Sequence, residues 1–245
     1  KSKKHNKQNK QHIKDIKNKT IKPIKTKKQP SKTKKQPSKT KKQPSKTKNK
    51  DSTIKQPTSK ASTINFVDAF TKVYENNIWG DNNDSNYEGS SGTGSDIKYN
   101  IKTYVPFLKH FIKKHKIKNV VDLGSGDFLV GLLIYDKMGV NYTGYDAYKT
   151  LVDFNNKKYE GYGDYKFIHS DFRAIGERKK IVPAELCILK DVVQHWPTAD
   201  IIDFIDYLVE SKKFKYILLI NCFTGNPENN AIHRITLVIC KVYIV

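Results

Sequence analysis

The sequence predicts a doubly wound α/β domain, a mostly parallel sheet with helices on both faces. Two observations support this fold class. From residue 117 onward, short apolar runs alternate with stretches of helical periodicity, which is typical of βαβ units. Each apolar run ends in a glycine, a carboxylate or a polar cluster, and parallel sheets bind their ligands at the carboxyl ends of the strands. The remaining elements follow in chain order.

Residues 1–60 form a lysine-rich tail that we expect to be disordered. They contain 23 lysines and two acidic residues, a net charge of +21 out of +22 for the whole chain. No aromatic side chain is present, and the unit Gln-Pro-Ser-Lys-Thr-Lys-Lys recurs from Gln29, Gln36 and Gln43 with one change. Such a composition buries too little apolar surface to offset chain entropy. The tail is either a solvated tether or an electrostatic contact to nucleic acid or another polyanion.

Residues 61–116 are expected to hold two helices separated by a glycine-rich lid. Apolar residues at helical spacing predict a first helix from about 64 to 78, with Ser62 or Thr63 as its N-cap. The segment Gly80–Ser95 is polar and unusually long for a connection, so we expect a mobile lid or a plain linker. A second helix over 97–112 is predicted to bend near Pro106.

Residues 117–245 are expected to form the α/β domain itself. Predicted strands cover 118–123, 141–146, 165–169, 185–190 and 215–221, and predicted helices cover 127–138, 148–159 and 199–210. The stretch 235–245 reads as one further strand. We therefore expect a fold that is shortened at its C-terminal end.

The first strand runs into a glycine turn, Asp122-Leu-Gly124-Ser-Gly126. Glycines there permit a tight turn and a close approach of the backbone to a ligand. A nicotinamide dinucleotide site would need a third glycine where Leu129 stands, and no G-x-x-x-x-G-K-[ST] motif occurs. The turn thus argues against both a pyrophosphate ligand and a P-loop nucleotide site.

The next strand ends offer further ligand groups. Asp146 ends the second strand, where a carboxylate can accept both hydroxyl groups of a ribose. Asp171 and Phe172 follow the third strand and suit the amino group and face of an adenine. The fourth strand ends in a polar and aromatic cluster running from Lys190 to Pro197.

These stretches resemble, in order, the successive motifs of class I S-adenosylmethionine-dependent methyltransferases. They are Val-Val-Asp-Leu-Gly-Ser-Gly, Tyr-Thr-Gly-Tyr-Asp, His-Ser-Asp-Phe and Leu-Lys-Asp-Val-Val-Gln-His-Trp-Pro, and the resemblance covers about 117–222. It implies a Rossmann-like fold and S-adenosylmethionine as the cofactor. It implies cofactor contacts at Asp122, Gly124, Gly126, Asp146, Asp171, Phe172 and Lys190, with Asp191 and His195 nearer the substrate.

Two residues keep alternative interpretations. Methyl transfer needs a base only where the nucleophile must lose a proton, so His195 is either that base or a brace for its loop. Trp79 either stacks on the cofactor or belongs to the apolar face of the first helix. Ile78-Trp-Gly80 and Ser91-Gly-Thr-Gly-Ser95 are weakly similar to a cofactor-covering segment of some family members.

The resemblance implies a methyltransferase whose methyl acceptor is unknown. The fourth predicted strand ends in Lys-Asp-Val-Val rather than in the Asn/Asp-Pro-Pro-Tyr/Phe of enzymes that methylate amino groups of bases or of glutamine, which disfavours those acceptors. No cysteine follows a proline, as a cytosine C5 methyltransferase would require. Small molecules and protein side chains stay open as acceptors. The alternative is a catalytically silent protein, shortened at its C-terminus, whose basic tail binds nucleic acid or another polyanion.

The cysteine spacing and the apolar stretches lead us to expect a soluble protein in a reducing compartment. Cys187, Cys222 and Cys240 are widely spaced, without the pairing expected of zinc ligands or a disulfide framework. The longest apolar stretch, 235–245, is too short to span a bilayer. We therefore expect an intracellular protein without membrane contact. Abundant Lys, Asn and Ile suggest an AT-rich genome, such as that of a large DNA virus.

Overall fold

The computed structural model describes residues 65–82, 87, 89–223 and 234–241. The expected disordered tail, the candidate caps Ser62 and Thr63, part of the predicted lid and residues 242–245 lie outside the described residues.

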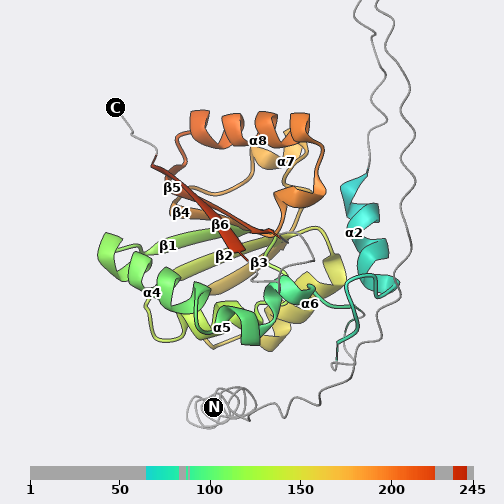
Figure 1. Cartoon of the computed structure of the whole chain (residues 1–245), viewed down its shortest axis with the longest axis horizontal. Helices are drawn as coiled ribbons and strands as arrows, with labels where there is room; N and C mark the ends of the chain where they lie inside the picture. The colour runs from blue at the N-terminus through green and yellow to red at the C-terminus, as the bar shows by residue number, and fades with distance from the viewer. Residues whose placement is uncertain (1–64, 83–86, 88, 224–233, 242–245) are drawn as a thin grey trace, which may run out of the picture.

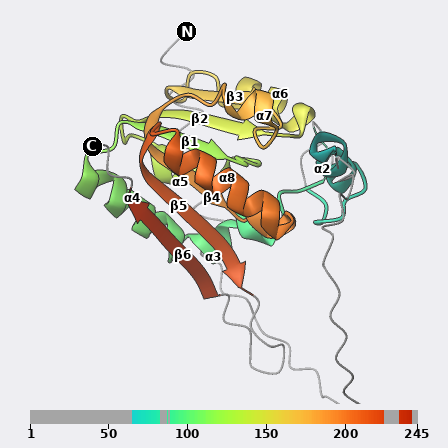
Figure 2. The same cartoon turned by 90° about the horizontal axis from the view of Figure 1, so that it is seen from above.

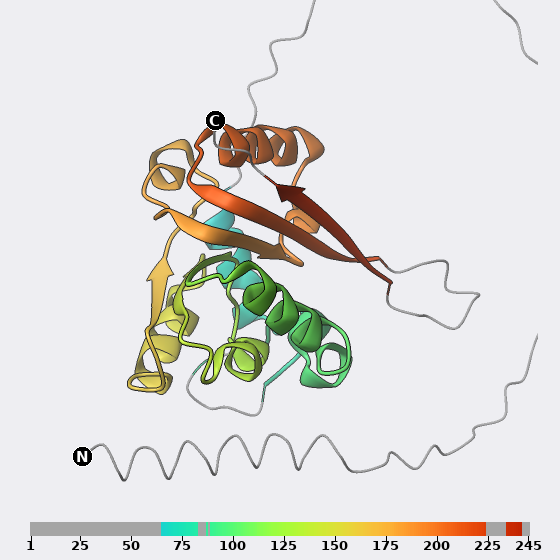
Figure 3. The same cartoon turned by 90° about the vertical axis from the view of Figure 1, so that its left-hand side faces the viewer.

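The centre of the fold is one six-stranded sheet with the strand order β3-β2-β1-β4-β5-β6. Its strands are β1 (Asn119–Leu123), β2 (Asn141–Asp146), β3 (Tyr165–His169), β4 (Ala184–Lys190), β5 (Phe214–Phe223) and β6 (Arg234–Lys241). The first five are parallel, and β6 runs antiparallel along β5 (Figure 3). All five strands predicted for the parallel sheet are confirmed, and in the part of the chain that the structure describes β6 follows them, within the region where a further strand was predicted.

Helices cover both faces of this sheet, so the prediction of a doubly wound, Rossmann-like α/β fold is confirmed. The helices α4 (Tyr104–His115), α5 (Leu129–Tyr135) and α6 (Lys149–Lys158) cover one face, and α7 (Ile175–Arg178) and α8 (Thr198–Glu210) cover the other (Figures 1 and 2). Successive strand residues point to opposite faces. Val120 accordingly joins the core beneath α4 and α5, whereas Val121 joins the core beneath α8.

The N-terminal helices differ from the sequence prediction in detail. The first, α2 (Phe66–Glu75), begins after Asn65, whose side chain accepts a hydrogen bond from the Asp68 N–H, so the cap is neither Ser62 nor Thr63. The predicted second helix is two helices, α3 (Ile97–Asn100) and α4. The break lies at 101–103, and Pro106 follows in the first turn of α4, where N–H groups lack intrahelical partners.

The helix after the glycine turn is shorter than the 127–138 predicted. Phe128 precedes it in the left-handed conformation, with φ of 58°, so α5 begins only at Leu129. Its ring is buried among aromatic neighbours, including Tyr142 at 4.6 Å and Phe167 at 5.1 Å between centroids. Burial of this ring stabilises a backbone conformation that is unfavourable for a residue with a Cβ.

Candidate functional site

One pocket at the carboxyl ends of the strands contains every site residue that the sequence predicts. It has about 1070 Å³ of empty space, part of it open to solvent. Its lining includes Trp79, Asp122, Gly124, Gly126, Asp146, Asp171, Phe172, Lys190, Asp191 and His195. Strands β1, β2 and β4 supply most of these residues directly or through the loops that follow, which is where open α/β sheets bind ligands.

The glycine turn after β1 is held against the neighbouring strands. The N–H groups of Gly124 and Ser125 both donate to the carbonyl oxygen of Tyr145, at 2.8 and 3.0 Å. Gly124 has φ of 91°, and a Cβ there would lie 2.3 Å from Val192 Cγ2. Only glycine therefore fits this position, because both the backbone conformation and the approach of the β4 loop require it.

Asp146 joins the turn to the end of β2. Its Oδ2 accepts from the Gly126 N–H at 2.9 Å and its Oδ1 accepts from the Tyr148 N–H at 3.0 Å. Burial raises the pKa of this carboxyl, while the two backbone donors act in the opposite direction. Each carboxylate oxygen can accept more than one hydrogen bond, so the group retains capacity for ligand hydroxyls.

Asp122 lines the pocket near the end of β1. The Tyr142 hydroxyl donates to its Oδ2 at 2.8 Å. Burial raises the pKa of Asp122 to about 7, although Tyr142 and the Lys190 charge oppose that shift. The pocket thus contains a carboxyl that is partly protonated near neutral pH.

Asp171 and Phe172 line the same pocket after β3. Phe172 is buried, and its ring centroid lies 6.0 Å from Trp196 and 5.9 Å from Phe204. Its ring is thus part of the core beneath α8 as well as a wall of the pocket.

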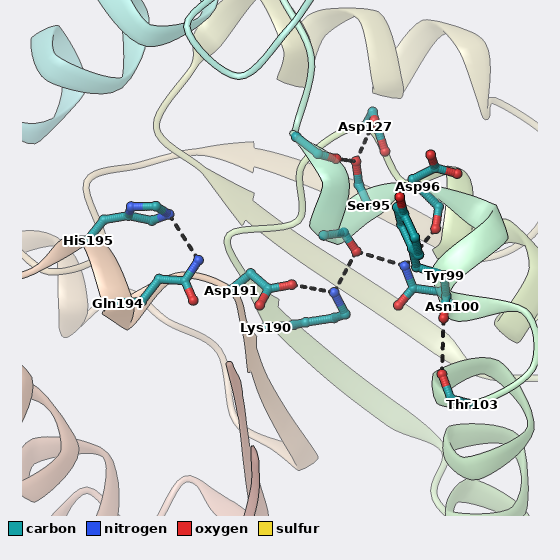
Figure 4. Close-up of polar contacts among 12 residues, drawn as sticks. Ser95, Asp96, Tyr99, Asn100, Thr103, Asp127, Lys190, Asp191, Gln194 and His195 are labelled. Carbon is teal, nitrogen blue, oxygen red and sulfur yellow. Dashed lines mark hydrogen bonds and ion pairs between the residues drawn. The ribbon is translucent and has the colours of Figure 1, made fainter. Parts of the chain in front are cut away.

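Lys190 and Asp191 form an ion pair where β4 ends (Figure 4). The Lys190 ammonium donates to Asp191 Oδ2 at 2.5 Å and to the Gly94 carbonyl oxygen at 2.6 Å. Asp191 adopts the left-handed conformation with φ of 58° and donates its N–H to the Ile220 carbonyl at 2.7 Å. A non-glycine residue in this conformation is uncommon and often occurs at functional sites.

His195 and Trp79 meet at the mouth of the pocket. Their ring centroids are 5.0 Å apart, and His195 Nε2 lies 3.4 Å from Gln194 Nε2 (Figure 4). Burial against apolar neighbours lowers the pKa of His195, and the negative charge of Asp191 opposes this effect. The imidazole is therefore neutral at neutral pH, as a general base must be.

Sequence reasoning missed the polar contacts that tie the 89–95 segment to the pocket. Ser91 Oγ accepts from the Asp127 N–H at 2.9 Å and lies 2.9 Å from the Tyr74 hydroxyl. Ser95 Oγ donates to Asp127 Oδ2 at 3.2 Å. Burial raises the pKa of Asp127 to about 6. Only the position of Asp127 directly after the glycine turn could have marked it in the sequence.

In residues 65–82, 87, 89–223 and 234–241, no group of His, Cys, Asp and Glu side chains is placed to hold a metal ion. Within the same residues, no helix has the length and apolar character needed to cross a bilayer.

No protein-family model and no curated protein matches the chain by sequence. Solved structures similar to it include the methyltransferase domain of bacterial CtHen1, at 15% identity over 49% of this chain and 65% of that chain, with a TM-score of 0.42. An O-methyltransferase family protein from Burkholderia thailandensis is 12% identical over 54% of this chain and 40% of that chain, with a TM-score of 0.43.

A third similar structure is the magnesium protoporphyrin IX methyltransferase of Synechocystis with bound SAH. It is 17% identical over 54% of this chain and 59% of that chain, with a TM-score of 0.43. The chain thus spans less than two thirds of the length of each of these three proteins. At these identities the likeness extends to the fold alone.

Proposed function

We propose that the chain is an S-adenosylmethionine-dependent methyltransferase. The observation that supports this most is that the four strand-end motifs line one pocket, together with residues of the segment before α3. The chemistry of those motifs indicates the kind of cofactor that the pocket would bind.

The residues present fit a nucleoside joined to an amino acid. Asp146 offers a buried carboxylate for ribose hydroxyls, and Asp171 and Phe172 offer an acceptor and an aromatic wall for adenine. In the glycine turn, Ser125 Oγ is buried and has no hydrogen-bond partner among the described residues, so a polar ligand atom would satisfy it. Asp122 also lines the pocket, and a cationic ligand beside it would favour the charged form of its carboxyl.

When bound, S-adenosylmethionine supplies a methyl group: the carbon–sulfur bond breaks with its electron pair going to sulfur, while the acceptor forms a bond to the methyl carbon. The chain contributes binding, orientation and exclusion of water. His195 lies at the pocket mouth, where it can take the proton that the acceptor loses. Asp191 and Lys190 hold the segment around Gly94 beside this position.

Calorimetry with S-adenosylhomocysteine tests this proposal directly. Asp146→Ala should weaken binding by roughly 1–3 kcal/mol, because hydrogen bonds to a charged acceptor are lost. Asp153→Ala is the matched control, since that carboxylate is exposed on α6 and pairs with Lys149 at 2.6 Å. A folded wild-type sample that binds no S-adenosylhomocysteine would refute the proposal.

A second candidate function rests on the distribution of charge. Residues 1–60 carry +21 of the net charge of +22, which leaves the rest of the chain almost neutral. As this second candidate, we propose a protein whose tail binds nucleic acid or another polyanion and whose α/β domain is catalytically silent. Electrostatic attraction to phosphates would then supply the affinity.

A further inference from the structure

The mouth of the pocket beside His195 is built from aromatic rings. We call Phe70, Trp79 and His195 the aromatic rim. The ring centroid of Phe70 lies 5.8 Å from that of Trp79 and 6.3 Å from that of His195, and the latter two are 5.0 Å apart. All three side chains retain contact with solvent, so the rim is a surface that an incoming molecule meets.

A second layer of rings continues the rim into the pocket. Phe66 and Trp196 both line the pocket, with centroids 6.3 Å apart and planes at 75°. The Arg173 guanidinium lies 3.5 Å above the Phe66 ring. Trp196 is 8% exposed, and its buried indole N–H has no hydrogen-bond partner among the described residues. A polar atom of a ligand would satisfy that donor.

The charged groups around the rim are compensated. Lys190 pairs with Asp191, and Arg173 pairs with Asp200. The pKa of His195 is lowered by burial, so the imidazole carries no charge at neutral pH. A charged acceptor would therefore lose solvation at the rim without gaining an opposite charge.

We propose that the aromatic rim is the acceptor subsite, and that the acceptor is a planar, uncharged aromatic ring bearing a hydroxyl group. This inference rests on the proposed methyltransferase function. The acceptor oxygen forms the bond to the methyl carbon, the carbon–sulfur bond breaks toward sulfur, and the hydroxyl proton passes to a ring nitrogen of His195 and then to water.

The chemistry of the rim favours this class over two others. Aromatic side chains gain most from other planar rings, in offset or edge-to-face contacts. A sugar would need several polar side chains around it, whereas the only polar atoms of the three rim side chains are the ring nitrogens of Trp79 and His195. A primary amine would arrive as a cation and would have to lose its proton before attack.

Binding of probe molecules to the S-adenosylhomocysteine complex tests the acceptor class without relying on activity. Both tryptophans of the chain line the pocket, so their fluorescence reports its occupation. Catechol should bind saturably. Cyclohexanol, which is not planar, and benzylamine, which is cationic, should bind at least fivefold more weakly.

Phe70→Leu tests the rim because it removes a ring and keeps an apolar side chain of similar volume. We expect catechol affinity to fall roughly three- to tenfold, the equivalent of one aromatic contact, with S-adenosylhomocysteine affinity unchanged. Tyr99→Leu is the matched control, since Tyr99 is an exposed ring on α3 that does not line the pocket. It should change neither affinity.

The role of His195 as a base is tested by comparing the methylation rates of two acceptors. His195→Asn should lower the rate of catechol methylation strongly, and that of para-nitrophenol less, because the latter ionises near neutral pH without a base. Equal losses for both acceptors would contradict proton transfer to His195.

If S-adenosylhomocysteine binds but the three probes bind equally, the acceptor inference is wrong while the proposed function stands. If S-adenosylhomocysteine does not bind, the proposed function itself fails.

Discussion

At the scale of single residues, the pocket concentrates buried carboxyl groups. Asp122, Asp127 and Asp146 all line it, and burial raises the pKa of each. A buried carboxylate is costly unless a partner compensates it. The three groups are therefore most favourable when the pocket contains hydrogen-bond donors or positive charge, which S-adenosylmethionine would supply.

Asp122→Asn should stabilise the ligand-free protein at pH 8. The pKa of Asp122 in the folded state, about 7, lies above the ordinary aspartate value of 3.8, so between pH 3.8 and 7 the folded state binds more protons than the unfolded state and its stability falls as pH rises. We expect the free energy of unfolding at pH 8 to rise by at least about 1.4 kcal/mol, the equivalent of one pKa unit.

Thermal unfolding at two pH values provides the measurement. At pH 5, which lies between the two pKa values, only part of this destabilisation has developed, so the variant should gain less in Tm than at pH 8. The same variant should bind S-adenosylhomocysteine more weakly. An equal change in Tm at pH 5 and pH 8 would count against this assignment.

At the scale of elements, the segment 89–95 connects the two sides of the pocket. Ser91 and Ser95 contact Asp127 after β1, while the Gly94 carbonyl accepts from Lys190 at the end of β4 (Figure 4). Its two inner glycines are needed for different reasons. Gly92 has φ of 74°, whereas a Cβ on Gly94 would lie 2.4 Å from Asp191 Oδ2.

Gly94→Ala therefore tests close approach alone, because its backbone is not in the left-handed region. Asp191 cannot move away freely, since Lys190 holds its carboxylate. Forcing a methyl group into this contact should cost roughly 1–3 kcal/mol, and affinity for S-adenosylhomocysteine should fall fivefold or more. Gly176→Ala is the control, because a Cβ there meets nothing within 4 Å. If calorimetry finds both variants equal to wild type, the segment does not shape the site.

At the scale of the whole molecule, the charge separates into a basic tail and a nearly neutral domain. If the tail binds nucleic acid, the full chain and a peptide of residues 1–60 should bind duplex DNA, and residues 61–245 should not. With six or more phosphate contacts, affinity should fall by roughly a thousandfold or more between 50 and 200 mM salt. Fluorescence anisotropy would measure this. Equal DNA affinity of residues 61–245 and the full chain would assign the binding to the domain instead.

The features that could be predicted from the sequence are local ones. The five parallel strands were predictable because an apolar run records burial on both faces of a sheet. Gly124, Asp146 and Lys190 were recognisable because each stands at a strand end, and parallel strands bring their ends to one edge. The net charge of residues 1–60 follows directly from their numbers of basic and acidic residues.

Contacts between segments that are distant in the sequence could not be predicted, because they form only in the folded chain. Phe70 has the periodicity of any apolar helix face, and its position beside His195 depends on how α2 packs at the pocket mouth. Ser91 reaches Asp127 across 36 residues, and Phe128 adopts its left-handed conformation because its ring is buried in the aromatic core. Such features depend on packing energies summed over residues that are far apart in the chain, which no local pattern encodes.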